Sequence, residues 1–468
     1  MSPFGFTPDE NPDENPENNR ENNPQDFAAM MRQMQEQIQK QFKEMGLNPA
    51  GFINPLAAFT QAAQGKGEAL PKALVRDTAK KFIQAQGSQP VGTKDVTVVN
   101  NSLELAELWL NEATVFPATT ALSNSASTST STGTSNNSAV SRLDWIDETL
   151  PGWQSTMEPL ATGLANAITR LLEESQSQGL PEGFPQGFPQ GAENPMGAIA
   201  GLLRSFIGSL IATQLGQAIG GAGVSATGAH DVALPLLNPA RPLLMPENID
   251  KWSTDLEIPQ TEVYLFHALR EAAVARLFAH NPWLVSYIQS AIVEYGRGIH
   301  IDIEAIQRQA EEALSHFDPS DMNPQNAENS FTIALNNGIF TPEETPQQRA
   351  ALSKLETALA LIDGWADEVT SLAAGDRLPA LTALREMYRR QRATSAPSQQ
   401  LFKSLLGLEV SPKLAREASA FWQKIREERD IATRDQIWSG ILPTADELLD
   451  PHGFIASTQV PDDLSGLL

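Results

Sequence analysis

The sequence predicts a mainly α-helical protein. Apolar residues recur every three to four positions over most of the chain from residue 197 onward, and the alternation typical of strands is scarce. Proline and asparagine gather between these stretches, where they favour loops. The strongest periodic segments, each expected to form a helix, are 201–220, 261–280, 283–297, 303–316, 347–373, 377–391 and 411–429.

The N-terminal part predicts a disordered tail followed by a helical extension. Residues 1–26 are mostly Asn, Pro, Asp and Glu, which bury too little apolar surface to offset the entropy of ordering. An amphipathic helix is expected over residues 27–45, with a methionine-rich face that could pack on the body or bind a protein partner. The run DVTVV at 95–99 is compatible with a short strand before a helix over 103–113.

Two low-complexity stretches divide the chain. Residues 118–140 are rich in Ser, Thr and Asn, and residues 176–196 contain the repeat EGFPQGFPQG, so both are expected to be flexible connectors. The expected units are therefore a 1–26 tail, a 27–117 helical region, the 118–140 linker, a 141–175 helical segment, the 176–196 linker and a 197–468 helical domain.

Composition argues against several functional classes. The net charge is −24, from 33 basic and 57 acidic residues, which disfavours nucleic acid and anionic membrane surfaces as partners. The absence of cysteine rules out disulfides and thiolate zinc sites. The first residues lack the basic and apolar regions of a signal peptide, so we expect a cytoplasmic protein.

Residues 197–225 are apolar for long enough to imitate a membrane span. Arg204 and two glutamines within them would be costly in hydrocarbon, so a buried core helix is expected instead. Small residues recur every fourth position, which lets another helix approach closely. These are Gly208, Ala212, Gly216 and Gly220.

The segment 261–284, TEVYLFHALREAAVARLFAHNPWL, resembles the motif helix of an actinobacterial family of zincin-like proteins described as hydrolases or zinc-dependent metalloproteases. The resemblance extends over about three-quarters of the chain. Its other pieces are LAELWLNEAT (105–114), LDWIDETLPGW (143–153), MPENIDKW (245–252), ALALIDGWADEV (358–369), FKSLLGLEVSP (402–412) and LPTADELLDP (442–451).

The resemblance implies a zincin-like helical domain with a degenerate metal site. Active zincins carry His-Glu-x-x-His, whose two imidazoles bind zinc while the glutamate acts as general base. The first histidine falls on Arg270, the glutamate on Glu271, the second histidine on Val274 and a later carboxylate ligand on Asp363. A guanidinium has no free lone pair for a metal. We therefore expect no zinc cofactor, a vestigial base at Glu271, and an ion pair of Arg270 with Asp363 and with Glu271.

Other histidines were considered as substitute ligands. His267 shares a helix face with the motif glutamate, although a hydrogen-bonded structural histidine is the commoner outcome. His280 ends the helix, where a cation interacts favourably with the helix dipole. The spacing of His300, Asp302 and Glu304 could hold a metal, but acidic residues are also expected where a helix begins. The acidic pairs Glu356/Asp363 and Asp367/Glu368 could do acid–base work, but solvated helical charge is the commoner outcome and is expected here.

Three functions remain open at the level of sequence. The first is a scaffold or interaction protein that keeps the fold without catalysis. The second is an active hydrolase with a non-standard metal site or a metal-free carboxylate base. The third is a structural or regulatory protein whose partner binds the methionine-rich helix.

Overall fold

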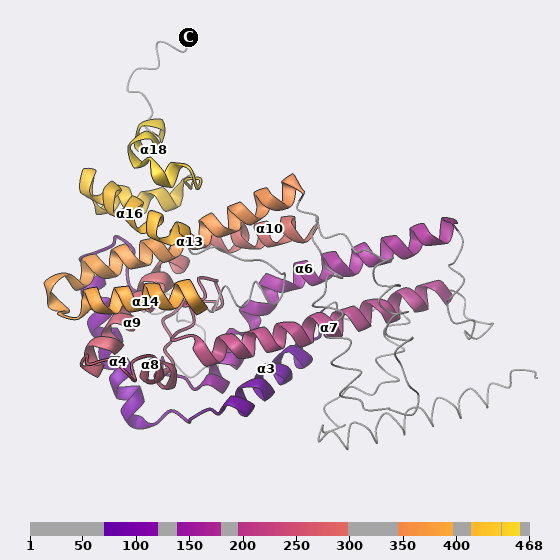
Figure 1. The fold of residues 1–468 in the computed structure, drawn as a ribbon, viewed down its shortest axis with the longest axis horizontal. Helices are drawn as coiled ribbons and strands as arrows, with labels where there is room; N and C mark the ends of the chain where they lie inside the picture. The colour runs from indigo at the N-terminus through magenta and orange to yellow at the C-terminus, as the bar shows by residue number, and fades with distance from the viewer. Residues whose placement is uncertain are drawn as a thin grey trace, which may run out of the picture.

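The computed structural model describes residues 70–119, 138–178, 195–297, 345–395, 413–440 and 442–458. Within these residues the chain forms helices and short 3₁₀ turns, and its only β pairing is a pair of isolated bridges (Figure 1). The elements are α3 (Lys72–Gln86), α4 (Thr93–Leu110), α6 (Arg142–Gln178), α7 (Pro195–Ser225), α8 (Pro246–Trp252), α9 (Gln260–His280), α10 (Trp283–Arg297), α13 (Pro346–Ala374), η2 (Gly375–Arg377), α14 (Leu381–Ser395), α16 (Lys413–Glu428), α17 (Ile431–Gln436), η3 (Ile437–Ser439), η4 (Glu447–Leu449) and α18 (Pro451–Thr458).

The mainly α class is confirmed, and six of the seven expected periodic segments correspond to α7, α9, α10, α13, α14 and α16. The strand considered at 95–99 is wrong, because α4 already begins at Thr93. The Asp95 carboxylate accepts a hydrogen bond from the Gly92 amide at 2.8 Å, and Val99 is fully buried. Capping and burial therefore outweigh the weak strand preference of β-branched residues.

Helix α9 is the central element of the molecule. Every residue from Val263 to Phe278 is buried, and the helix contacts α4, α8, α13 and α14. A helix enclosed in this way cannot send its charged side chains to solvent, so each must find a partner inside the protein. Four such residues lie on α9, namely His267, Arg270, Glu271 and Arg276.

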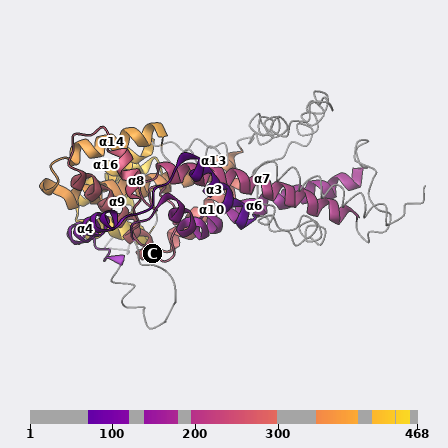
Figure 2. The same ribbon diagram turned by 90° about the horizontal axis from the view of Figure 1, so that it is seen from below.

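Helices α6 and α7 run side by side and extend together away from the body (Figures 1 and 2). Helix α3 packs on α7 at the small residues predicted to allow close approach. A Cβ atom on Gly216 would lie 2.6 Å from the Thr78 Cβ, and one on Gly220 would lie 2.7 Å from the Phe82 Cβ. The prediction of close helix packing is confirmed. No helix in the described part of the chain is long and apolar enough to cross a membrane.

One hydrophobic cluster includes buried residues from Leu70 to Phe454. It draws side chains from the 27–117, 141–175 and 197–468 segments alike, so these share a core. Packing also begins before the expected end of the first linker. Ala139 and Val140 are buried, and Val140 N–H donates to the Leu244 carbonyl at 3.0 Å.

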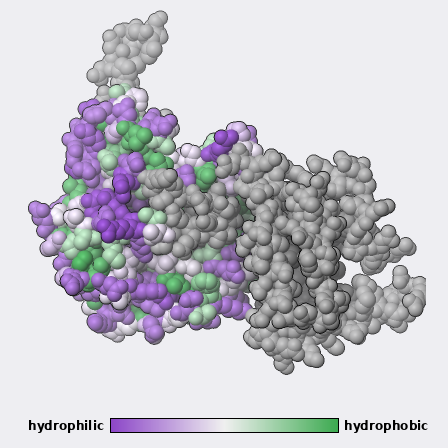
Figure 3. Space-filling view, viewed as in Figure 1, coloured by the Kyte–Doolittle hydropathy of each residue, from purple (hydrophilic) through white to green (hydrophobic). Residues whose placement is uncertain are grey.

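The described face in Figure 3 shows hydrophilic and hydrophobic residues interspersed. Several expectations concern residues outside the described ranges. They are the 1–26 tail, the methionine-rich helix at 27–45, most of both linkers, the helix at 303–316, and the group of His300, Asp302 and Glu304.

Candidate functional site

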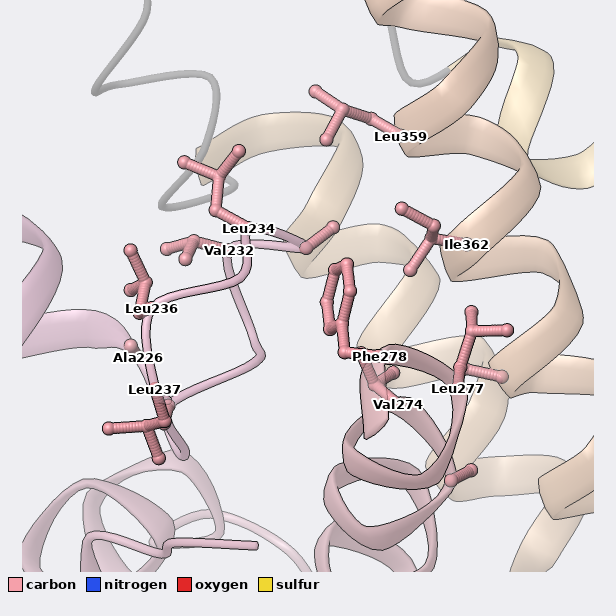
Figure 4. Close-up of a cluster of buried hydrophobic side chains, with 14 of the residues drawn as sticks. Ala226, Val232, Leu234, Leu236, Leu237, Val274, Leu277, Phe278, Leu359 and Ile362 are labelled. Atoms are coloured by element: carbon pink, nitrogen blue, oxygen red, sulfur yellow. The ribbon is translucent and has the colours of Figure 1, made fainter. Parts of the chain in front are cut away.

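A pocket lies where α9, α13 and α14 meet the loop 226–245, which connects α7 to α8. Its volume is about 20 Å³. Figure 4 shows part of an apolar cluster beside it, in which Val274 of α9 and Ile362 of α13 lie across from the loop that carries Leu234. The pocket is lined by Thr227, His230, Asp231, Ala233, His267, Arg270, Glu271, Val274, Ile362, Asp363, Tyr388 and Arg392.

Arg270, which is buried, and Asp363, which is partly buried, form an ion pair at this pocket. The Arg270 Nη2 donates to the Asp363 Oδ1 at 2.6 Å, as predicted from the sequence. Arg392 Nη2 donates to the same oxygen at 3.0 Å. The Tyr388 ring lies beside both guanidinium groups, 4.0 Å from that of Arg270 and 5.2 Å from that of Arg392. Two cations therefore share one carboxylate and one aromatic face.

Asp367 and Glu368 are buried, so the expectation that they are solvated is wrong. Asp367 accepts hydrogen bonds from Arg385 and Arg389, each at 2.7 Å, and Arg426 pairs with Glu368 at 2.5 Å. Burial alone would raise the pKa of Asp367, but the neighbouring arginines outweigh it and hold that pKa well below its usual range. The helical spacing of α13 could not show that α14 and α16 bring cations to it.

Glu271 is saturated with hydrogen-bond donors. Its carboxylate accepts from the amides of Ala229, His230 and Leu243 at 3.0, 3.1 and 3.1 Å. The His230 Nδ1 lies 2.8 Å from its Oε1. A Cβ atom at Gly228 would lie 2.3 Å from its Oε2, so the loop reaches the carboxylate only because this residue is glycine. The predicted contact of Glu271 with Arg270 is wrong, because loop 226–245 supplies the partners instead.

His267 lies on α9 one turn before Glu271 and is 3% exposed. Its Nδ1 is 3.1 Å from the Thr227 Oγ1, and the same hydroxyl donates to the Asp231 Oδ2 at 3.3 Å. Burial lowers the pKa of His267 to about 4, and the Arg270 charge acts in the same direction against the opposing effect of Asp231. The ring is therefore neutral at pH 7.

Asp231 forms the polar floor of the pocket together with α14. Its Oδ1 accepts from the Tyr388 hydroxyl at 2.8 Å, and its Oδ2 accepts from the Thr227 amide at 3.0 Å. Burial would raise the pKa of Asp231, but the Arg392 charge and these hydrogen bonds lower it overall. Asp231 is therefore an ionised anchor for the loop and α14.

His280 lies outside the pocket. Its Nδ1 is 2.9 Å from the Arg276 carbonyl, and its ring stacks on Phe116 with the centroids 5.6 Å apart. A histidine at the last residue of α9 that contacts a carbonyl of the last turn acts as a C-terminal cap.

The sequence model of a family described as zincin-like metallopeptidase matches residues 72–455. The chain belongs to this family. A solved structure, described as "a putative hydrolase with a novel fold from Chloroflexus aurantiacus", matches with a TM-score of 0.50. The match covers 83% of this chain and 98% of that chain at 17% identity, so it shows a shared fold. No curated protein matches.

The residues that the sequence analysis expects at the zincin ligand positions do not fit a zinc ion. Arg270 and Val274 offer no lone pair, and the Asp363 Oδ1 is held by two guanidinium groups. Glu271, which would have to accept a proton from a metal-bound water, already accepts from four nitrogen donors. Within the described residues no group of three or more His, Asp or Glu side chains is arranged to hold a metal ion.

Sequence reasoning missed four ionisable residues of the pocket. They are His230 and Asp231 on the loop, and Tyr388 and Arg392 on α14. One signal was present, because His230 and Asp231 are an isolated polar pair next to the apolar run Val232 to Leu237. The α14 residues carried no comparable signal, since arginines on a polar helix usually face solvent.

Proposed function

We propose that this zincin-like chain is catalytically degenerate, with an arginine in place of the zinc ion, and that it acts as a scaffold or interaction protein. The observation that carries the proposal is the 2.6 Å hydrogen bond from Arg270 to Asp363. It joins the residue aligned with a metal-ligating histidine to the residue aligned with the later carboxylate ligand. In this proposal the guanidinium takes over the role of the cation, and it has no coordination site for a water molecule.

The limited exposure of Arg270 and Asp363 explains why the sequence carries both of these residues. The side chains of Arg270 and Asp363 are 8% and 19% exposed, so either charge alone would be costly. An arginine supplies the positive charge that the carboxylate requires, in a planar geometry suited to oxygen acceptors. The lost imidazole at position 274 is replaced by a valine, which adds to the apolar wall of the pocket.

Zinc titration of designed variants tests the proposal. We expect no stoichiometric zinc in the full chain purified without chelators, and none in Val274→His, because one imidazole beside the Arg270 charge makes a poor site. Arg270→His combined with Val274→His restores two histidines four residues apart on α9, so this double variant should bind zinc more tightly than Val274→His alone. Metal analysis and calorimetry give the stoichiometry. One equivalent of zinc in the unmodified chain would contradict the proposal.

A metal-free hydrolase is a second candidate, and the contact between His230 and Glu271 favours it. A carboxylate that holds one imidazole nitrogen orients the other as a base, as in a catalytic dyad. The expected sign would be hydrolysis of peptide or ester substrates in the presence of a chelator. That activity should be lost in His230→Phe and retained in His280→Phe, which alters a histidine outside the pocket.

A further inference from the structure

Three buried nitrogen atoms of the pocket have no hydrogen-bond partner. They are the Nε2 of His230, the Nε2 of His267 and the Nε of Arg270. All three residues line the same pocket, and they are only 3%, 3% and 7% exposed. Buried polar atoms are nearly always satisfied in folded proteins, so three of them around one cavity indicate a missing partner.

The surrounding contacts decide which of these atoms are acceptors. The Nδ1 of His230 contacts a carboxylate, which can only accept, so this nitrogen carries the proton. In the neutral ring the Nε2 is then a lone pair. The Arg270 Nε carries a hydrogen at all accessible pH values and is a donor.

The Nε2 of His267 is also an acceptor, because the Thr227 hydroxyl links the His267 ring to Asp231. The Thr227 hydroxyl hydrogen is donated to Asp231, which leaves the hydroxyl oxygen to accept from the His267 Nδ1. The Nε2 of this neutral ring is therefore a second lone pair. The pocket presents two acceptors and one donor.

We propose that this pocket binds a primary carboxamide, the group carried by asparagine and glutamine side chains. Its amide nitrogen offers two hydrogens for the two imidazole lone pairs, and its carbonyl oxygen accepts from the Arg270 Nε. A carboxylate would leave both histidines without a donor, and an ammonium group would leave the Arg270 Nε without an acceptor. This inference rests on the proposed function, because it takes the site to be free of metal.

The size of the pocket limits how much of a ligand can enter. About 10–15 Å³ is needed for one water-sized group, and the pocket volume is about 20 Å³, so only the polar end of a ligand is held inside. Ala233, Val274 and Ile362 add apolar surface to the lining, against which the methylene groups of a glutamine side chain can pack. The ligand expected is therefore a molecule that inserts one primary carboxamide group.

Nitrogen NMR of the full chain with labelled histidines tests the inference directly. The chain has six histidines, and His230→Phe and His267→Phe identify the two signals of interest. Acetamide and acetate, which have four heavy atoms each, and the smaller cation methylammonium are titrated separately at pH 8 with a chelator present. We expect acetamide to shift both Nε2 signals saturably, with at least tenfold weaker responses to the other two probes. N-acetylglutamine amide should act in the same way, and N-acetylglutamate amide should not.

The controls separate a ligand site from a water-filled cavity. His280→Phe should keep the acetamide response, because this ring lies outside the pocket. Circular dichroism confirms that each variant is folded. Equal responses to the three probes, or no saturable response to acetamide, would show that the cavity holds only water and would overturn the inference. Zinc titration tests the proposed function separately, so the two can fail independently.

Discussion

Two arginines on α9 lie six residues apart, and they show opposite kinds of burial. Arg276 is fully buried, and all three of its side-chain nitrogens have fixed acceptors. They donate to the Glu107 carboxylate at 2.8 Å, the Phe116 carbonyl at 3.0 Å and the Asn111 side chain at 2.9 Å. Arg270 pairs with Asp363, yet its Nε has no partner and it borders a cavity.

The difference separates a structural clamp from a candidate site. Arg276 ties α9 to α4 and to the segment that follows it, and every group that it touches is committed to the fold. Arg270 belongs to a group in which protein atoms satisfy only part of the polar surface. Polar networks of that kind are costly unless something else completes them. Burial alone would not distinguish these two residues, whereas the count of satisfied donors does.

The largest expected effect is the loss of the clamp. Arg276→Met should lower the free energy of unfolding by about 3–5 kcal/mol, because it leaves the Glu107 carboxylate without its cation. Urea unfolding of the full chain measures the change. Arg390→Met is the matched control, since this arginine is 77% exposed and contacts Glu386 one turn away. It should cost less than about 1 kcal/mol. Similar losses in the two variants would contradict the role assigned to Arg276.

A pH effect of intermediate size is expected at His267. The folded protein does not protonate this ring until about pH 4, whereas an unfolded histidine does so near 6.5. The neutral ring therefore contributes stability that is fully present above pH 6.5 and is lost progressively as the pH falls to 4. The loss could reach roughly 3 kcal/mol.

Unfolding free energies measured from pH 4 to 8 test this effect. His267→Gln should flatten the pH dependence, because a glutamine can still contact Thr227 but does not titrate. His452→Gln, at a side chain that is 68% exposed, should leave the dependence unchanged. An unaltered profile in His267→Gln would show that other groups cause the pH dependence.

The smallest effect is expected at Arg270 itself. Arg270→Met should destabilise the protein by about 1–2 kcal/mol, which is the cost of lost hydrogen bonds to a charged group. Asp363 keeps Arg392, and Asp367 keeps Arg385 and Arg389, so neither carboxylate is left alone. The measurement is again urea unfolding. If Arg270→Met lowered the free energy of unfolding as much as Arg276→Met, both arginines would have the same structural role, which would contradict the comparison drawn above.

The fold was largely predictable from the sequence because helical periodicity extends over long segments. Helices α9, α10 and α13 begin and end within one residue of the expected positions. The error at 95–99 arose from β-branched residues, whose local preference is weak and was overridden by burial of Val99. Short elements such as α8, which begins at a proline between two of the expected helices, were missed because seven residues carry little periodic signal.

The pairing of Arg270 with Asp363 was predicted for a physical reason, namely that the motif alignment places both at one site and opposite charges there compensate each other. The environment of Glu271 could not be predicted. It depends on a loop whose backbone amides point at the carboxylate, and the close approach at Gly228 is visible only in three dimensions. Every residue except proline has a backbone N–H group, so the residue types in a sequence do not show which amides will donate to a carboxylate.

The sequence by itself determined the helical class and the order of most helices. It also has Arg270 and Val274, which cannot coordinate a metal, where the family resemblance implies zinc-binding histidines. These depend on periodicity and on residue chemistry, which are local properties. Only the tertiary structure decided that α14 brings Arg392 to Asp363 and that His230 reaches Glu271. Those contacts join residues 29 and 41 positions apart, and packing between separate elements sets such distances.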